Sequence, residues 1–408
     1  MDLSNSLIAD LHLHSRFSRA CSKNITIPEL VKWARVKGIG VLGTSDFTHP
    51  VWLEDIKKYL KSNEKGFYYY EDEKGKFPFI ISGEISLMYT QEKGRRIHLV
   101  LLIPSIEIAD KINEYFDTKG RRDYDGRPIF KILGHEFVKD MRKISKLIEI
   151  IPAHIWTPWF GVFGSKSGFD SLKECFQDEI KNIHAIETGM SSDPPMNWRI
   201  NELKDISIVS FSDSHSFWPW RLGREATIFH KTDSYKQLIG QIRKNSFIGT
   251  IETDPGYGIY HYDGHRDCNF SCNPQKTKEL GGICPKCKRP LTIGVENRVE
   301  ELAENEEGFE HKNSKPFFKL LPLHEVISLF VGVGINSKKT WGVYNNLIEK
   351  FKTEFNILLE VSEDDFIKAE IDNKLINLIL LNREGKIKVK PGYDGVYGKP
   401  VLGGSVGK

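Results

Sequence analysis

Long hydrophobic runs are missing from this sequence of 408 residues. The longest apolar stretches, such as residues 99–103, have the length of a strand and fall far below the roughly 20 residues that a membrane-spanning helix needs. The first six residues show no basic segment followed by an apolar run, so we expect no signal peptide. Repeats, low-complexity tracts and heptads are also lacking. We therefore expect a globular protein of the cytoplasm, with no membrane partner.

The sequence has no large excess of one sign of charge, and it has few cysteines. The 58 Lys and Arg residues against 55 Asp and Glu residues leave a net charge of +3, so a polyanion would have to bind local patches. Of the six cysteines, four lie within residues 268–287, while Cys21 and Cys175 are isolated and are interpreted as packing residues. This distribution favours a reducing compartment and one metal site over a disulfide framework.

What the sequence does contain is an alternation of short apolar segments with helical stretches over its first 250 residues. This alternation predicts an α/β fold built as a closed or nearly closed barrel. Breaks at 254–258 and 300–315 divide the chain into parts at 1–253, 254–313 and 314–408, the last with two or three helices and a closing hairpin. The eight expected strands are 7–12, 40–45, 79–82, 97–103, 148–151, 183–186, 206–210 and 226–229.

Histidines and acidic residues stand where these strands end. His12 and His14 are two residues apart, so on a strand they share a face. In a parallel barrel the carboxyl ends of the strands form one rim, which is where barrel enzymes build their sites. The candidate metal ligands are His12, His14, Asp46, His49, Glu84, His98, His154, Glu187, Asp213 and His215, and all except His49 and Glu187 form the predicted catalytic set.

The composition of this set indicates the chemistry. Imidazole and carboxylate together suit zinc, manganese or iron, and so many ligands exceed the needs of one ion. We expect two or three divalent ions, zinc or else magnesium or manganese. Such a centre could activate a water and stabilise the leaving oxygen of a phosphodiester.

The cysteine cluster has the pattern Cys-x3-Cys-x11-Cys-x2-Cys, which predicts one structural zinc held by Cys268, Cys272, Cys284 and Cys287. His261 and His265 are nearby and could replace one thiolate, and a redox dithiol is the weaker alternative. Seven basic residues, including Lys286 and Arg289, stand against four acidic ones between residues 255 and 298. This balance indicates a modest phosphate-binding face or, equally, an ordinary solvated surface.

Aromatic residues gather in the loops after the predicted fifth to seventh strands. These rings could stack on bases or form a pocket for an extruded nucleotide, or they could simply pack the mouth of the barrel. Nearby hydroxyl and carboxyl groups could bind the edge of a base. The residues predicted to contact DNA in these loops are Trp156, Trp159, Phe160, Ser191, Ser192, Asp193 and Trp218.

Several of these motifs resemble those of the polymerase-and-histidinol-phosphatase (PHP) superfamily. The resemblance rests on residues 10–15 (Asp-Leu-His-Leu-His-Ser), Gly83-Glu84, Ala153-His154 and 212–215 (Ser-Asp-Ser-His). It implies a distorted (β/α)7 barrel with a di- or trinuclear metal centre that hydrolyses phosphoesters. Two positions depart from the usual pattern, since many members have Asp where this chain has Arg19 and His where it has Asp46.

The order of the three parts is similar to that of the endonuclease Q family. That family nicks DNA on the 5′ side of deaminated bases (uracil, hypoxanthine, xanthine) and of abasic sites. The resemblance therefore implies a cytoplasmic, nucleoid-associated repair enzyme with a small four-cysteine zinc module and a small, mainly helical C-terminal domain that binds DNA. Damaged double-stranded DNA, and single-stranded DNA as well, would be its partner, and the sequence does not specify a sliding clamp or other repair proteins. The matching segments are 260–268, 284–287, 291–295, 322–326, 354–359 and 391–398.

Two alternatives belong to other classes. A phosphatase for small phosphate monoesters would use the same metal rim but would have no need of residues 255–408. A DNA-binding protein without catalysis would need the zinc module but not a full ligand set. A nicking assay on uracil-containing duplex DNA, beside an assay on phosphate monoesters, separates the three possibilities.

Overall fold

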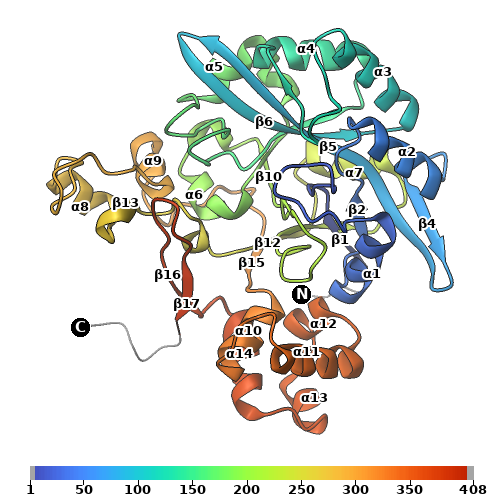
Figure 1. Ribbon diagram of the computed structural model, residues 1–408, viewed down its shortest axis with the longest axis vertical. Coiled ribbons are helices and arrows are strands. Elements are labelled where there is room, and N and C mark those ends of the chain that lie inside the picture. Colours follow the sequence, from blue (N-terminus) through green and yellow to red (C-terminus); the bar gives the residue numbers. More distant parts are fainter. Residues whose placement is uncertain (1–4, 402–408) are drawn as a thin grey trace.

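The computed structural model describes residues 5–401, and its parts are separate in space (Figure 1). A large α/β body, blue to yellow, carries a small gold module at one side and a group of orange helices beneath it. The first four residues, which belong to the segment where we expect no signal peptide, lie outside the described range. Within that range, no helix has both the length and the apolar character that crossing a membrane would require.

Each of the eight predicted strands overlaps a strand of the body. Short strands β3, β4, β7 and β12 were not predicted, and β5 is far longer than expected because it continues to Gln91. The strands are β1 (Ser6–Asp10), β2 (Val41–Gly43), β3 (Lys61–Ser62), β4 (Tyr68–Asp72), β5 (Gly75–Gln91), β6 (Lys93–Ile103), β7 (Ile129–Phe130), β8 (Glu149–Pro152), β9 (Ala185–Glu187), β10 (Ser207–Val209), β11 (Ala226–His230) and β12 (Gly249–Glu252).

The strands are not all parallel, so the expectation of a parallel barrel is wrong in this respect. β1 is parallel to β2 and β2 to β5, but β6 runs antiparallel to both β5 and β8, and β11 runs antiparallel to β1. The cause is local, because only Glu92 separates β5 from β6, whereas a parallel crossover needs a dozen or more residues. The two strands form a long hairpin that projects beyond the body in Figure 1.

The body nevertheless curls back on itself. β9 and β10 form a separate parallel pair, and the N–H of Ile155, just after β8, donates to the carbonyl of Glu187 at 3.1 Å. A parallel bridge between Leu13 and Ser214 then brings the chain after β10 beside the chain after β1. Strands β1, β2, β5, β6, β8, β9 and β10 therefore follow one another around a common space.

Helices cover the outside of these strands. The first helix begins where the Thr26 side chain accepts a hydrogen bond from the Glu29 N–H, and it ends at Gly38, whose φ is 93°. The helices of the body are α1 (Ile27–Lys37), α2 (Pro50–Tyr59), α3 (Ile106–Asp117), α4 (Gly134–Ile144), α5 (Leu172–Phe176), α6 (Pro194–Trp198) and α7 (Tyr235–Arg243).

The module at the side consists of β13 (Asp263–His265), β14 (Phe270–Cys272), α8 (Pro274–Glu279) and α9 (Val295–Leu302). Its own core is small, with Cys272, Cys284 and Leu291 as the buried apolar members. Arg298 on α9 anchors it to the body, because its guanidinium donates to the carbonyls of Phe163 and Phe169 at 3.1 Å each.

The C-terminal part holds five helices rather than the two or three predicted. Two of the helices have only six residues each, and Thr353, Ser362 and Asp372 each begin a helix by accepting a backbone N–H in place of a proline or glycine break. The elements are β15 (Phe317–Lys319), α10 (Leu323–Val331), α11 (Lys338–Phe351), α12 (Glu354–Leu359), α13 (Glu363–Lys368), α14 (Asn373–Arg383), β16 (Lys388–Lys390) and β17 (Lys399–Val401).

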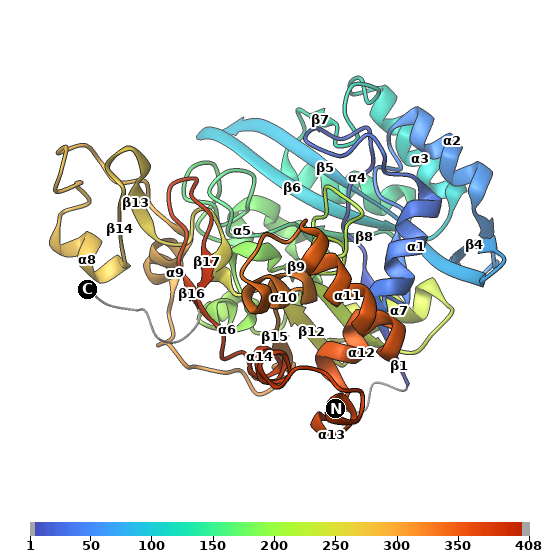
Figure 2. The same cartoon turned by 60° about the horizontal axis from the view of Figure 1, so that its bottom comes forward.

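These elements do not form one separate unit. β15 pairs with β12 and so extends the sheet of the body. The hairpin of β16 and β17 leaves the helices and lies beside α9, as Figure 2 shows. The helices are joined to the body by a fully buried ion pair of 2.6 Å between Lys37 on α1 and Glu354 on α12.

Candidate metal centre

Ligand atoms from the ends of several strands converge in the space that the strands of the body enclose. They form three overlapping groups, and within each group the atoms all lie within 4.8 Å of one another. The structure thus brings together seven of the ten predicted metal ligands. The groups are His12, His14 and Glu84; His14, Asp213 and His215; and Glu84, His98 and His154.

The atoms that face one another lack other partners. His12 Nε2, His14 Nε2 and Asp213 Oδ1 are buried without a hydrogen bond, although an unsatisfied buried polar group costs about 1–3 kcal/mol. Asp213 Oδ1 lies 3.0 Å from His14 Nε2 and 3.7 Å from His12 Nε2. Two imidazole nitrogens and a carboxylate oxygen are ligands that a divalent ion prefers, so these residues fit a metal centre.

Glu84 lies at the middle of the centre and is completely buried. Its carboxylate is 2.8 Å from His98 Nδ1, 3.1 Å from His154 Nε2 and 3.4 Å from His14 Nε2. Burial by itself would raise the pKa of Glu84, but the charges on His98, Arg127 and His12 hold it well below its usual value. The carboxylate is therefore ionised and can bridge two ligand groups.

The electrostatics of the histidines also suit a cation. Burial would lower the pKa of His12, but the charges of Glu187 and Glu84 raise it well above its usual value. For His98, burial outweighs the effect of the Glu84 carboxylate and lowers the pKa to about 4. Carboxylates thus create a preference for positive charge at His12, which a bound metal would satisfy in place of the proton.

Two predicted ligands, Asp46 and Glu187, lie outside the ligand groups. Glu187 Oε1 is 2.9 Å from His12 Nδ1, and Asp46 Oδ1 is 3.2 Å from His14 Nδ1. A carboxylate at the far nitrogen fixes the orientation of a ligating imidazole and leaves its other nitrogen for the metal. These residues therefore position His12 and His14 rather than join them as ligands.

His49 is also outside the ligand groups. Its ring stacks on Phe17 with the centroids 4.0 Å apart, and it stands at the N-cap of α2. The sequence placed it three residues after Asp46, but the helix begins there and turns the ring away from the centre. His49 is a packing residue in this structure.

Sequence reasoning missed Arg127. Its Nη1 lies 3.0 Å from Glu84 Oε2, so a fixed cation faces the metal centre. Arg127 follows Gly126, where any side chain would collide with Asp46. This glycine was the sequence feature that could have indicated a close approach of the backbone to the site. Arg19, at the position where PHP members often carry Asp, is exposed and pairs with Asp125 at 3.2 Å.

A cavity of about 540 Å³ opens beside the ligands, and His98, His154 and Asp213 form part of its wall. Of the residues predicted to contact DNA near this site, Trp159, Phe160 and Ser191 line it. The remaining wall includes Arg19, Arg127, Arg224, Met190, Tyr260, His261 and Tyr397. Its size falls in the range of ordinary ligand pockets, about 300–1,000 Å³.

Four other residues predicted to contact DNA serve the fold. Trp156 is fully buried and donates to Asn197 Oδ1 at 2.8 Å, and the hydroxyl of Ser192 donates to the Thr188 carbonyl at 3.1 Å. Asp193 caps α6, and its carboxylate lies 2.9 Å from Lys319 Nζ. Trp218 stacks on Trp220 and contacts Trp341 of the C-terminal helices.

The second group of ligand atoms lies in the module and consists of His265, Cys268, Cys284 and Cys287. This group differs from the predicted four cysteines at Cys272, whose Sγ instead lies 3.2 Å from Thr277 Oγ1. The register of the hairpin explains this difference. His265 pairs with Phe270 next to the turn, whereas Cys272 pairs with Asp263, two residues farther along the hairpin. The alternative ligand His261 lines the large cavity instead.

Burial would raise the pKa of Cys284, but the backbone N–H groups of Cys287 and Lys286 lower it. A lowered thiol pKa favours the thiolate that binds metal. Lys286 and Arg289, the two predicted phosphate contacts of the module, are exposed, and Lys286 Nζ donates to the Cys268 carbonyl at 2.8 Å.

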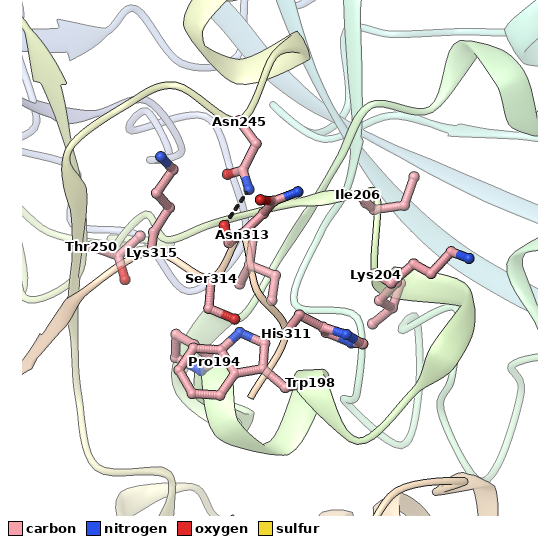
Figure 3. Close-up of a pocket in the computed structure, with 12 residues that line it drawn as sticks. Pro194, Trp198, Lys204, Ile206, Asn245, Thr250, His311, Asn313, Ser314 and Lys315 are labelled. Carbon is pink, nitrogen blue, oxygen red and sulfur yellow. Dashed lines mark hydrogen bonds between the residues drawn. The ribbon is translucent and has the colours of Figure 1, made fainter. Parts of the chain in front are cut away.

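A second, much smaller cavity lies between α6 and the segment that follows the module (Figure 3). Its volume is about 20 Å³, enough for about one water. Four of the atoms that line it are buried and unpartnered: Asn245 Oδ1, Thr250 Oγ1, His311 Nε2 and Ser314 Oγ. This small cavity suits a structural water. The large cavity is the candidate site for a substrate because His98, His154 and Asp213 form part of its wall.

Comparisons with known proteins find relatives of different parts of this chain. Residues 322–386 match the family described as the MJ0043 C-terminal domain. MJ0043 of Methanocaldococcus jannaschii is 36% identical over 251 residues, which are 60% of this chain but only 31% of that protein. YqxK of Bacillus subtilis is 26% identical over 412 residues, covering 96% of this chain and 98% of the relative.

Solved structures resemble nearly the whole chain. The lesion-specific endonuclease PfuEndoQ from Pyrococcus furiosus has a TM-score of 0.86 and 28% identity, over 97% of this chain and 95% of that one. Endonuclease Q in complex with a 27-mer duplex carrying an abasic lesion has a TM-score of 0.85 and 28% identity, over 97% and 96%. Over nearly its whole length, this chain therefore resembles the endonuclease Q structures.

Proposed function

We propose that this chain is a metal-dependent DNA endonuclease with a PHP-type barrel, which cleaves the phosphodiester on the 5′ side of a deaminated base or an abasic site. One observation carries the proposal: unpartnered atoms of His12, His14 and Asp213 converge beside a cavity large enough for a nucleotide. Endonuclease Q, which this chain resembles, is known with an abasic duplex at its active site. Damaged duplex DNA is therefore the substrate that we infer.

The ligand groups support more than one divalent ion, zinc, magnesium or manganese. His14 and Glu84 each belong to two of the three groups, so each would contact neighbouring ions. Bound ions would supply an activated water and would stabilise the leaving oxygen of the phosphodiester. In the module, His265 with Cys268, Cys284 and Cys287 would hold one structural zinc.

The residues of the chain would orient both the ligands and the substrate. Glu187 and Asp46 fix the rings of His12 and His14 through their far nitrogens. Arg127 is a preformed cation in the cavity wall, where it would neutralise a non-bridging phosphate oxygen as charge develops. Its ion pair with Glu84 holds it in place before the substrate binds.

The large cavity would accept a nucleotide turned out of the duplex. Extrusion costs a few kcal/mol, and less where pairing is already weakened by deamination or base loss. Trp159 and Phe160 form part of the wall and could stack on the base, while Ser191 offers polar groups for its edge. A deaminated base carries a carbonyl where an amino group stood, so a fixed N–H donor in the wall would favour it.

The test is nicking of an end-labelled duplex that contains one uracil, hypoxanthine or abasic site, with zinc, magnesium or manganese added in turn. Asp213→Asn should lose nearly all nicking yet bind the duplex within several-fold of the wild type, because the lost group acts in chemistry. The matched control is Asp233→Asn, which removes an exposed carboxylate that pairs with Lys65. Normal nicking by Asp213→Asn, or hydrolysis of phosphate monoesters without any nicking, would contradict the proposal.

A further inference from the structure

Tyr397 is an exposed aromatic residue at the rim of the large cavity. It follows the turn of the β16–β17 hairpin, and 60% of its surface is accessible, the highest value among the exposed large apolar residues between 5 and 401. It lines the same cavity as Asp213 and His154. In the free protein the apolar surface of this ring is exposed to water, and burying it against a partner would be favourable.

Several hydrogen bonds fix the turn that precedes Tyr397. Tyr393 and Val396 exchange both backbone hydrogen bonds, at 2.7 and 3.0 Å, around the two central residues Asp394 and Gly395. Both central residues have positive φ values, 42° and 86°, as in the tight Asp-Gly turn of a hairpin. The carboxylate of Asp394 also accepts from the Arg266 N–H at 2.6 Å, which ties the turn to the module.

The flanks of the turn are fixed to the cavity wall. The N–H of Gly395 donates to the Ile259 carbonyl at 2.8 Å, and the N–H of Gly392 donates to the Gly256 carbonyl at 2.8 Å. A side chain on Gly398, the residue after Tyr397, would collide with the carbonyl of Gly256. The backbone therefore holds the ring of Tyr397 at the rim before any partner arrives.

We propose that Tyr397 inserts its ring into the base stack of the bound duplex and occupies the space that the extruded nucleotide leaves. The proposal rests on the proposed function, since it needs a damaged duplex at this cavity. The extruded base would meet Phe160 in the wall, whereas Tyr397 at the rim would meet the neighbouring bases that remain in the helix. Exposed Arg19, also in the cavity wall, could pair with the adjacent phosphate.

Inserted side chains are a common means of keeping a distorted duplex open, and stacking between an aromatic ring and a base tolerates any sequence. Loss of the ring should slow cleavage of both uracil and abasic duplexes by about tenfold or more, because both substrates leave a gap. Cleavage of the same lesions in single strands should change less than about twofold, since no gap exists there. Tyr397→Phe should behave as the wild type, because stacking needs the ring and not the hydroxyl.

The experiment measures single-turnover nicking of four substrates, with uracil or an abasic site in a duplex or a single strand, by the wild type, Tyr397→Ala and Tyr397→Phe. Tyr59→Ala on α2 is the matched control, because it removes an aromatic ring that is 38% exposed and lies outside the cavity wall. A loss confined to uracil substrates would show stacking on the extruded base and would overturn the proposal. An equal loss on single strands, or a loss with Tyr397→Phe, would overturn it as well.

A binding readout separates this proposal from the proposed activity. In the Asp213→Asn background, 2-aminopurine placed opposite an abasic site should change fluorescence on binding, and Tyr397→Ala should reduce that change. The same signal with and without the ring would overturn the insertion of Tyr397 even where nicking is normal. If Tyr397→Ala reduces the fluorescence change but the wild type nicks none of the lesions, insertion of Tyr397 is supported and only the proposed nicking activity is contradicted.

Discussion

The two groups of metal-ligating residues in this chain differ in what surrounds them. The histidine and carboxylate centre lies within the body, whose apolar core extends over its strands and covering helices, and His12, His14 and Glu84 are buried there. The group of His265 and three cysteines lies in a module whose own apolar core has only three buried side chains, two of them cysteines. The histidine and carboxylate centre is built on an apolar core, whereas in the module the ligand group largely takes the place of an apolar core.

This difference separates the roles expected of the two metals. The body can fold on its apolar core and then present ligands held by other residues, such as Glu187 behind His12. The module has too little apolar surface to be stable alone, and small folds of this kind usually depend on a metal or disulfides. Metal should therefore determine activity in the first site and folding in the second.

The largest expected effect is the loss of the module with its zinc. In finger peptides structural zinc contributes about 10 kcal/mol or more of binding free energy. Replacing Cys284 and Cys287 by Ser should remove one zinc per chain, expose residues 263–302 to protease and weaken DNA binding, while the body keeps its melting transition. Zinc content and limited proteolysis measure this.

The matched control is Cys272→Ser, which changes a cysteine outside the ligand group. It should retain the zinc, whereas His265→Asn should lose it. If Cys272→Ser loses the zinc and His265→Asn keeps it, the four-cysteine ligand set predicted from the sequence is right and the assignment from the structure is wrong.

The buried carboxyl groups at the metal centre and elsewhere in the body differ in their protonation. Glu84 is ionised among imidazoles, whereas Glu252 shares the hydroxyl of Ser210 with a second buried acid, Glu225, at 3.0 and 3.3 Å. Burial raises the pKa of Glu252 to about 8, against the hydrogen bonds that Thr188 and Ser210 donate to its carboxylate. Burial, together with the charge on Glu252, also raises the pKa of Glu225 well above its usual value.

The sign of the pH dependence follows from these shifts. Between the unfolded pKa near 4.5 and the folded pKa of Glu252 near 8, the native protein binds more protons than the unfolded chain. The free energy of unfolding should therefore fall by a few kcal/mol as the pH rises from 5 to 8. Glu252→Gln should flatten this profile and be more stable than the wild type at pH 8, as urea unfolding would show. The exposed control Glu114→Gln should keep the wild-type slope, and an unchanged slope in Glu252→Gln would contradict the prediction.

A smaller effect is expected for the residues that orient ligands. Glu187→Gln preserves the shape of the side chain but removes the charge behind His12, so metal affinity or activity should fall by about 10–100-fold. Added metal should restore part of the nicking rate, because the ligands themselves remain. Nicking by Asp213→Asn, which lacks a ligand atom, should not recover under the same titration. If both variants respond alike, the distinction between ligand and orienting residue fails.

Much of the site could be predicted because its signals are local. His12 and His14 share a strand face, and Asp213 and His215 follow a strand end, so spacing alone indicates ligands. The roles of Asp46 and Glu187 depend on which nitrogen of a histidine each one meets, and no spacing encodes this. Arg127 lies in an irregular segment and reaches Glu84 only through the folded chain.

The fold shows the same division. The apolar runs located all eight predicted strands, but the direction of β6 depended on the single residue between it and β5. Cys272 fitted a thiolate pattern, yet the register of its hairpin places His265, and not Cys272, in the group with the other three cysteines. Patterns along the chain thus indicate which residues matter, while pairing and register decide what each of them does.

The smallest expected effect concerns the exposed lysines of the module and of the hairpin. With a net charge of only +3, DNA affinity should rest on a few local contacts, and each phosphate contact lowers the slope of log affinity against log salt by about one. Lys286→Ala in the module and Lys388→Ala on β16 should each weaken binding a few-fold, equally for damaged and undamaged duplexes, because contacts to phosphate do not read the base. Lys58→Ala on α2, which is also exposed, is the matched control and should bind as the wild type does. Anisotropy titrations between 50 and 200 mM salt measure these slopes. An effect of Lys286→Ala alone would mean that the DNA backbone contacts the module, and an effect of Lys388→Ala alone would mean that it contacts the hairpin. An affinity that does not depend on salt would contradict both contacts.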